Sequence, residues 1–172
     1  DSIFDGVAIR TKSVDSCWLV GASYGNIDQT DYFIENGIWK NGYTDKYLNK
    51  VNQVKVGDKI AIKSTFTQKH NLPFNVNGNT VSAMKIIVTG TVVKNIGDGR
   101  TFEVEWNEKY IEPKLWYFYT FRQTIQEIKR KADDWKPNAL LDFIFSNTTQ
   151  PYHKFLQDPY WNDLYPSSDD IP

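Results

Sequence analysis

Hydrophobic and polar residues alternate over several short stretches of the middle of the chain, a pattern typical of strands with one face buried. In the segment 59–66, isoleucines occupy positions 60 and 62, while lysines occupy positions 59 and 63. Asp98 followed by Gly99 has the form of a tight hairpin turn. The predicted strands are 17–22, 59–66, 81–93 with a bend at Gly90, 101–106, and the aromatic run 115–121.

Three segments have the composition of helices, with residues at their ends that typically begin or terminate a helix. The first is 29–37, with Asp28 or Thr30 as its N-terminal cap and Gly37 as its stop. The other two are 122–131 and 138–146, and Pro137 stands just ahead of the last. Residues 23–29 and 67–79 are polar and are predicted to be loops.

This order of elements predicts an α+β fold. Strands clustered between short turns indicate a twisted, mostly antiparallel sheet or a small barrel with flanking helices. The 172 residues, 40% of them hydrophobic, suffice for one domain with a core of its own. We expect a single domain over 1–172, with a core at about 14–131 and a helical C-terminal extension at about 132–172.

The composition excludes several classes of protein. With 24% charged residues and no apolar run near the roughly 20 residues of a spanning helix, the chain is predicted to be neither disordered nor in a membrane. It opens without a signal peptide and without an initiator methionine, which predicts a trimmed or processed chain. Cys17 is the single cysteine, so no internal disulfide can form, and we expect a reducing, cytoplasmic setting.

Charge is distributed unevenly along a chain whose net charge is −1. Residues 40–94 hold nine lysines and two acids, a balance of +7, whereas 132–172 hold seven aspartates and two lysines, a balance of −5. Such asymmetry indicates an anionic partner for the basic segment. The alternative is that these lysines are scattered over different faces, because successive strand residues point to opposite sides.

The sequence offers little for catalysis. It has no glycine-rich phosphate loop, and its two histidines, His70 and His153, lack the spacing of metal ligands. The paired aspartates at 133–134 and 169–170 stand in polar contexts typical of solvated surface, and Cys17 lies in an apolar run that indicates a buried thiol. We therefore predict a non-catalytic protein with no metal site and no cofactor.

Aromatic residues are abundant, at 15% of the chain, and most must lie in the core. Two of them stand in polar surroundings that core packing explains less well. Trp39 lies between Gly37 and a turn at Asn41, and Tyr24 lies in the polar stretch after the first strand. A tryptophan in a loop beside glycines is a candidate stacking platform for a planar ligand.

Residues 17–43, CWLVGASYGNIDQTDYFIENGIWKNGY, resemble the opening of YTH and EVE domains, which have PUA-like folds. In those families a Gly-X-Trp after a short helix supplies the first wall of an aromatic cage, and Gly37, Ile38 and Trp39 fit that motif. The likeness spans roughly 16–125. It departs from YTH domains in the loop 67–79, which holds no tryptophan, so the second wall would be Phe74, Trp116 or Tyr117.

A wider set of motifs is similar to the N-terminal recognition domain of McrB-like proteins, the AAA+ GTPase subunits of modification-dependent restriction systems. These motifs are Asp31–Phe33 together with Gly37–Trp39, followed by GDKIAIKS, LPFNVNG, TVSAMKI, GDGRTFEVEW and KLWYFYTFRQTI. The resemblance implies a DNA-binding module that recognises a flipped-out methylated base. It also implies double-stranded DNA as partner and, in a longer protein, a motor oligomer and a nuclease subunit.

We therefore predict two sets of site residues. The base-binding candidates are Trp39, Tyr24, Ser23, Asn26, Trp18, Phe74, Trp116 and Tyr117. The phosphate-binding candidates are Lys40, Lys63, Lys69, His70 and Arg122.

Two other functions remain open. The chain could be an RNA-binding PUA-like or YTH-like reader, in which 2′-hydroxyl contacts favour RNA. It could also be a protein-interaction or small-molecule module whose aromatic residues are purely structural. The sequence does not choose between 5-methylcytosine and N6-methyladenine.

Overall fold

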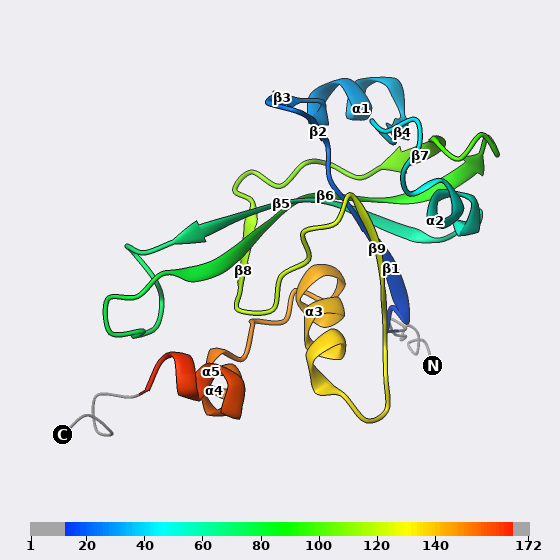
Figure 1. Ribbon diagram of the computed structural model, residues 1–172. Helices are drawn as coiled ribbons and strands as arrows, with labels where there is room; N and C mark the ends of the chain where they lie inside the picture. Colours follow the sequence, from blue (N-terminus) through cyan, green and yellow to red (C-terminus); the bar gives the residue numbers. More distant parts are fainter. Residues whose placement is uncertain (1–12, 167–172) are drawn as a thin grey trace.

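A seven-stranded sheet forms the centre of the computed structural model, which describes residues 13–166 (Figure 1). A separate two-stranded hairpin follows the first strand. The strands of the large sheet are β1 (Ser16–Val20), β4 (Ile38–Lys40), β5 (Lys59–Gln68), β6 (Val81–Asn95), β7 (Thr101–Trp106), β8 (Lys114–Tyr117) and β9 (Ile125–Lys129). The hairpin consists of β2 (Ser23–Tyr24) and β3 (Ile27–Asp28).

The strand order in the large sheet is β4-β7-β6-β5-β1-β9. The first half of β6 also pairs with β8, and its second half pairs with β7. Among the described strands, β1 and β5 form the one parallel pair. The predicted α+β class with a mostly antiparallel sheet is therefore confirmed. Within residues 13–166 the end strands β4 and β9 do not pair with each other, so the sheet stays open rather than closing as a barrel.

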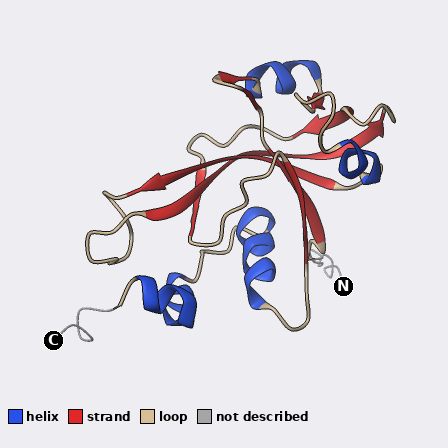
Figure 2. Ribbon diagram, viewed as in Figure 1, coloured by secondary structure: helices blue, strands red, loops and turns tan. Residues whose placement is uncertain are grey.

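Helices cover both faces of this sheet (Figures 1 and 2). Figure 1 shows α1 above the sheet, α2 towards one end, and α3, α4 and α5 below it. The helices are α1 (Thr30–Asn36), α2 (Leu48–Gln53), α3 (Trp135–Phe145), α4 (Tyr152–Gln157) and α5 (Pro159–Leu164). Two hydrophobic cores result, which we call the α1–α2 core and the α3–α5 core.

Strand β1 shows how the two cores share the sheet. Cys17 and Leu19 pack in the α3–α5 core, whereas Trp18 and Val20 pack in the α1–α2 core. Successive residues of a strand point to opposite faces, so a strand buried on both sides is apolar throughout. Cys17 is a buried thiol, as predicted, and burial together with the nearby Glu127 carboxylate raises its pKa.

The predicted helix at 122–131 is wrong, because the chain there forms the strand β9. Its two buried residues, Ile125 and Ile128, are three apart, which is also the spacing of one helical face. In the strand they point to opposite sides, Ile125 into the α1–α2 core and Ile128 into the α3–α5 core. The apolar spacing is compatible with both structures, and pairing with β1 decides between them.

The other helix predictions hold with changed limits. Helix α1 ends at Gly37, whose left-handed backbone, with φ 63°, forms the predicted stop. Helix α3 begins three residues before the predicted position, since Asp134 accepts a hydrogen bond from the Lys136 amide and so caps it. Helices α4 and α5 lie within the predicted helical extension, whereas the sequence pattern does not predict α2.

The aromatic strand predicted at 115–121 is shorter than expected, because β8 ends at Tyr117. Phe118, the next residue, has a φ of 78°, which takes the chain out of the extended conformation.

No helix within residues 13–166 is both long enough and apolar enough to cross a membrane.

Candidate functional site

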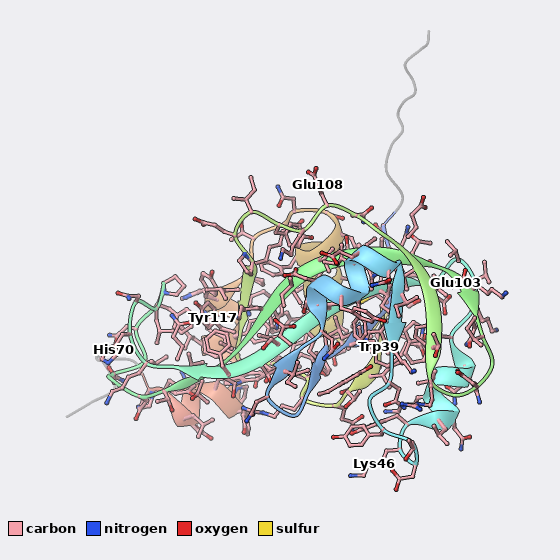
Figure 3. The ribbon with its side chains drawn as sticks, turned by 90° about the horizontal axis from the view of Figure 1, so that it is seen from above. Trp39, Lys46, His70, Glu103, Glu108 and Tyr117 are labelled. Atoms are coloured by element: carbon pink, nitrogen blue, oxygen red, sulfur yellow. The ribbon has the colours of Figure 1, made fainter. Side chains whose placement is uncertain are left out.

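The predicted aromatic cage does not form, because its candidate walls lie in two different cores. Trp39 belongs to the α1–α2 core and Tyr117 to the α3–α5 core, and Figure 3 shows the two side chains well apart. Trp39 is 0% exposed and stacks on Phe102, with 5.2 Å between the ring centroids. Its Nε1 donates a hydrogen bond of 2.8 Å to the Gly21 carbonyl. The indole is a core side chain and offers no free ring face to a ligand.

Two further tryptophans are engaged in the same way. Trp18 is buried and its Nε1 donates to Asp58 Oδ2 at 3.0 Å. Trp116 is buried in the α3–α5 core and donates to the Tyr119 carbonyl at 2.8 Å. A buried indole usually finds a partner for its N–H, and these contacts satisfy that need within the fold.

Three further base-binding candidates, Tyr24, Asn26 and Phe74, are more accessible, but Tyr24 and Phe74 pack against different cores. Tyr24 is partly buried against Phe33, and its hydroxyl donates to the Lys40 carbonyl at 2.8 Å. Phe74 packs on Phe118, with 4.7 Å between centroids, in the α3–α5 core. Asn26 is exposed at the turn of the β2–β3 hairpin.

One small polar pocket does bring together residues from both predicted sets. It has a volume of about 70 Å³ and lies between the β2–β3 hairpin, the start of α1 and the middle of β5 and β6. We call it the Ser23–Lys63 pocket. Its polar lining consists of Ser23, Asp28, Thr30, Lys63, Ser64 and Lys85.

Lys63 is the most unusual residue of this pocket. It is 5% exposed and lies where the pairing of β5 with β6 shifts register, between Ile62 and Lys63. Bulges of this kind redirect side chains and are frequent beside functional sites. The Lys63 ammonium donates to the Gln123 carbonyl at 2.7 Å. Burial, helped by the nearby Arg122 guanidinium, lowers the pKa of Lys63 to about 8.

Asp28 of β3 adds a fixed acceptor to the pocket lining. Its Oδ1 accepts hydrogen bonds from the amide of Thr30 at 2.9 Å and from the hydroxyl of Thr30 at 2.6 Å. These two bonds hold the carboxylate in one orientation. The pocket therefore offers a carboxylate, an ammonium and hydroxyl groups, which can recognise both donors and acceptors on a ligand.

Gln123 links the pocket to a second lysine, Lys50. Its backbone carbonyl accepts from Lys63, and its side-chain Oε1 accepts from the Lys50 ammonium at 2.8 Å. Three cationic side chains from distant parts of the sequence, Lys50, Lys63 and Arg122, thus gather around one residue. Lys50 belongs to the basic segment, but nothing in the sequence marks it as a contact, because only the fold brings it to Gln123.

The other phosphate-binding candidates lie elsewhere. Lys69 and His70 are exposed in the loop after β5, and Figure 3 shows His70 at the opposite end of the molecule from Lys46. Lys40 is exposed on β4. The structure therefore groups Lys63 with Arg122 and separates Lys69 and His70 from them.

Comparison with known proteins does not assign the chain: no family model matches it, and no curated protein is significantly similar. Within the described part of the chain, His, Cys, Asp and Glu side chains form no group of three or more that could hold a metal ion. The Ser23–Lys63 pocket and the lysines around Gln123 are therefore the candidate site.

Proposed function

We propose that the chain is a non-catalytic DNA-binding module that recognises an extruded, methylated base at the Ser23–Lys63 pocket. The observation that carries the proposal is the meeting of Ser23, a base-binding candidate, with Lys63, a phosphate-binding candidate, in one polar pocket. The same proposal includes a PUA-like fold of the EVE or YTH type. It also includes a cytoplasmic role as the targeting part of a McrB-like restriction system.

Polar contacts, rather than an aromatic cage, supply the discrimination in this proposal. A buried methyl group contributes only about 0.8 kcal/mol, which is less than a tenfold preference. Larger selectivity comes from groups that a wrong base would leave without a partner. Asp28 can accept from an exocyclic amino group, while Lys63 and Ser23 can donate to ring nitrogens or carbonyls.

The pocket must open to admit a base. Its volume of about 70 Å³ is well below the roughly 300 Å³ of the smallest usual ligand sites. The β2–β3 hairpin forms one wall, and each of its strands has two residues. So short a hairpin has little stability of its own. We therefore propose that the hairpin moves outward when the base enters.

A binding titration tests the function directly. The probes are three duplexes of one sequence, carrying a single 5-methylcytosine, a single N6-methyladenine or no modification, together with the matched RNA. Tighter binding to one methylated duplex is the expected result. Equal binding to all the duplexes would refute base recognition, and a preference for RNA would favour the RNA-reader alternative.

Ser23→Ala is expected to reduce the preference for the methylated duplex by about fivefold. The change removes one neutral hydrogen bond to the base, which contributes about 1 kcal/mol. The measurement is the ratio of the Kd values for methylated and unmethylated duplex. Asn26→Ala, on the same hairpin but outside the pocket lining, is the matched control and should leave that ratio unchanged.

DNA affinity is expected to fall by about tenfold between pH 7 and pH 9, because the Lys63 pKa is about 8. The Lys63 ammonium that contacts the DNA is present below this pKa and is lost above it. Lys63→Arg should abolish this pH dependence, since a guanidinium stays charged throughout the range. An unchanged pH profile in that variant would exclude Lys63 from the DNA contact.

The stability of the free protein should respond to pH in the opposite direction. The pKa of Lys63 falls from the 10.5 of a free lysine to about 8 on folding. The unfolded chain therefore binds more protons between these two values, and stability rises with pH in that window. Below pH 8 the cost of burying the charged amine is present in full. As the pH rises, DNA affinity should therefore fall while the stability of the free protein rises. A loss of binding can thus be distinguished from unfolding.

A further inference from the structure

A surface of tyrosine rings and lysines adjoins the Ser23–Lys63 pocket. Tyr43 is 43% exposed, and its ring lies 5.7 Å from that of Tyr47, centroid to centroid. The Lys46 ammonium stands over the Tyr43 ring at 5.1 Å from its centroid, a cation–π contact. Beside them lies a hollow of about 400 Å³, lined in part by Tyr47, Lys50 and Gln123.

The loop that carries these tyrosines is held in place from inside by Asn41, which is fully buried. The Asn41 side chain donates to the Lys46 carbonyl at 2.8 Å and accepts from the Tyr43 amide at 2.9 Å. Its own amide donates to the Arg100 carbonyl at 2.7 Å. The rings are therefore positioned before any ligand arrives, which lowers the entropy cost of binding.

The backbone of Tyr47 is strained in this loop. Its backbone has a φ of 66°, a left-handed conformation that a tyrosine rarely adopts. Strain of this kind persists where the surrounding structure imposes it, and it is concentrated at binding sites. The buried hydrogen bonds of Asn41 hold the residues that lead into Tyr47.

The hollow and the Ser23–Lys63 pocket are joined through Gln123. Lys50 lines the hollow and bonds to the Gln123 side chain, while Lys63 lines the pocket and bonds to the Gln123 carbonyl. Lys50 and Lys63 bond to Gln123 at this junction, and Arg122 is close enough to Lys63 to lower its pKa. Lys46 stands over the Tyr43 ring, and Asp45 is the one acidic residue in the described lining of the hollow. We call the whole the Tyr43–Gln123 surface.

We propose that the Tyr43–Gln123 surface binds the nucleotide next to the extruded base, with that nucleotide unpaired and unstacked. Tyrosine rings can stack on any base, and the neighbouring lysines suit the phosphates. Inside a duplex both faces of a base are covered by its neighbours, so a base reaches these rings only where the strand is open. The ligand is therefore a locally opened strand. This inference rests on the function proposed above.

The test compares duplexes that carry one methylated base, either fully paired or with a mismatch at the adjoining base pair. Both 5-methylcytosine and N6-methyladenine are used, and binding is measured by fluorescence anisotropy. The wild-type protein should bind the mismatched duplex more tightly. Tyr43→Ala should weaken that binding by roughly 5- to 150-fold, the worth of one stacked base, while Tyr43→Phe should retain it. Lys50→Gln should flatten the salt dependence of log K by about one unit of slope.

Matched controls exclude a general effect of losing an aromatic ring or a charge. Tyr160→Ala removes an exposed tyrosine on α5, and Lys131→Gln removes an exposed lysine from the segment after β9. Neither should change affinity or salt slope. Thermal unfolding should show the same Tm for Tyr43→Ala and the wild type, since the Tyr43 ring lies largely outside the core.

The outcomes separate the two proposals. One outcome is that the wild type prefers a methylated duplex while Tyr43→Ala and Lys50→Gln keep its affinity and its salt slope. That result would refute binding at the Tyr43–Gln123 surface and leave base recognition at the Ser23–Lys63 pocket intact. If no duplex, paired or mismatched, binds to the wild type, both proposals fail. Polyglutamate with the same charge as the mismatched duplex is a further probe. If the wild type bound it as strongly as the duplex, and Tyr43→Ala lost that binding, the surface would be an acidic-peptide site and the nucleotide assignment would be overturned.

Discussion

Trp39→Ala is expected to lower the free energy of unfolding by about 3–5 kcal/mol, the usual cost of removing a large aromatic side chain from a core. The indole of Trp39 is fully buried against Phe102 and donates a hydrogen bond to the Gly21 carbonyl. Alanine would leave a cavity at that position and an unpaired carbonyl one residue before the pocket lining begins. The measurement is chemical denaturation at a pH where unfolding is reversible.

The control for this change is Tyr32→Ala, which removes an exposed ring from α1 and should alter stability by less than about 0.5 kcal/mol. The competing view makes Trp39 the wall of a base-binding cage. In that case the alanine variant would keep its stability and lose about 1–3 kcal/mol of binding to methylated DNA. Denaturation and titration of the same variant therefore distinguish a core residue from a binding residue.

Gly90→Ala is expected to destabilise the protein by about 1–3 kcal/mol, the cost of overpacking a filled interior. Gly90 lies in the middle of β6, between Ile60 of β5 and Trp106 of β7. A Cβ atom there would lie 2.8 Å from each of three neighbours: the Glu105 carbonyl oxygen, the Trp106 ring and a Val104 methyl. Backbone and ring atoms cannot move aside without disturbing the β6–β7 pairing.

Gly21→Ala is the matched control for this prediction. A methyl group at Gly21 would meet no heavy atom within 4 Å beyond its chain neighbours, and the φ of Gly21 lies outside the range that favours glycine. The two variants make the same chemical change, so any difference in denaturation midpoint reports the space around the residue. Equal midpoints for the two variants would show that β6 and β7 adapt at Gly90 more readily than the contacts indicate.

The strands that have one buried face are the part of the fold that the sequence predicts best. The segment predicted at 101–106 is β7 with the same limits, and the strand predicted from residue 59 is β5, which runs two residues further. Their alternation is a local property, so it can be recognised without the rest of the fold. Strand β9 has the pattern of a helix because both of its faces are buried, which removes the alternation.

Individual residues of the candidate site could be predicted from the sequence, but their grouping in one pocket could not. Ser23 and Lys63 are both candidates from the sequence, but for separate roles, and the fold brings them together beside the register shift at Lys63. Trp39 is a candidate because it follows a glycine near a turn. What covers its ring is Phe102, a residue far along the chain that pairs with it across β4 and β7. Contacts over such sequence distances leave no local pattern, which is why the sequence could not distinguish a stacking platform from a core side chain.

Strand β1 has a further consequence for how the chain acquires its structure. Trp18 is opposite Ile60 on one edge and opposite Glu127 on the other, so both neighbours of β1 come much later in the sequence. Closing loops of this length must precede any gain from the contacts they enable, which slows folding. During synthesis the apolar segment Ser16–Val20 emerges before both of its partner strands, and its second edge stays uncovered until β9 has been made. Until then the unpaired edge of β1 is exposed and prone to aggregation.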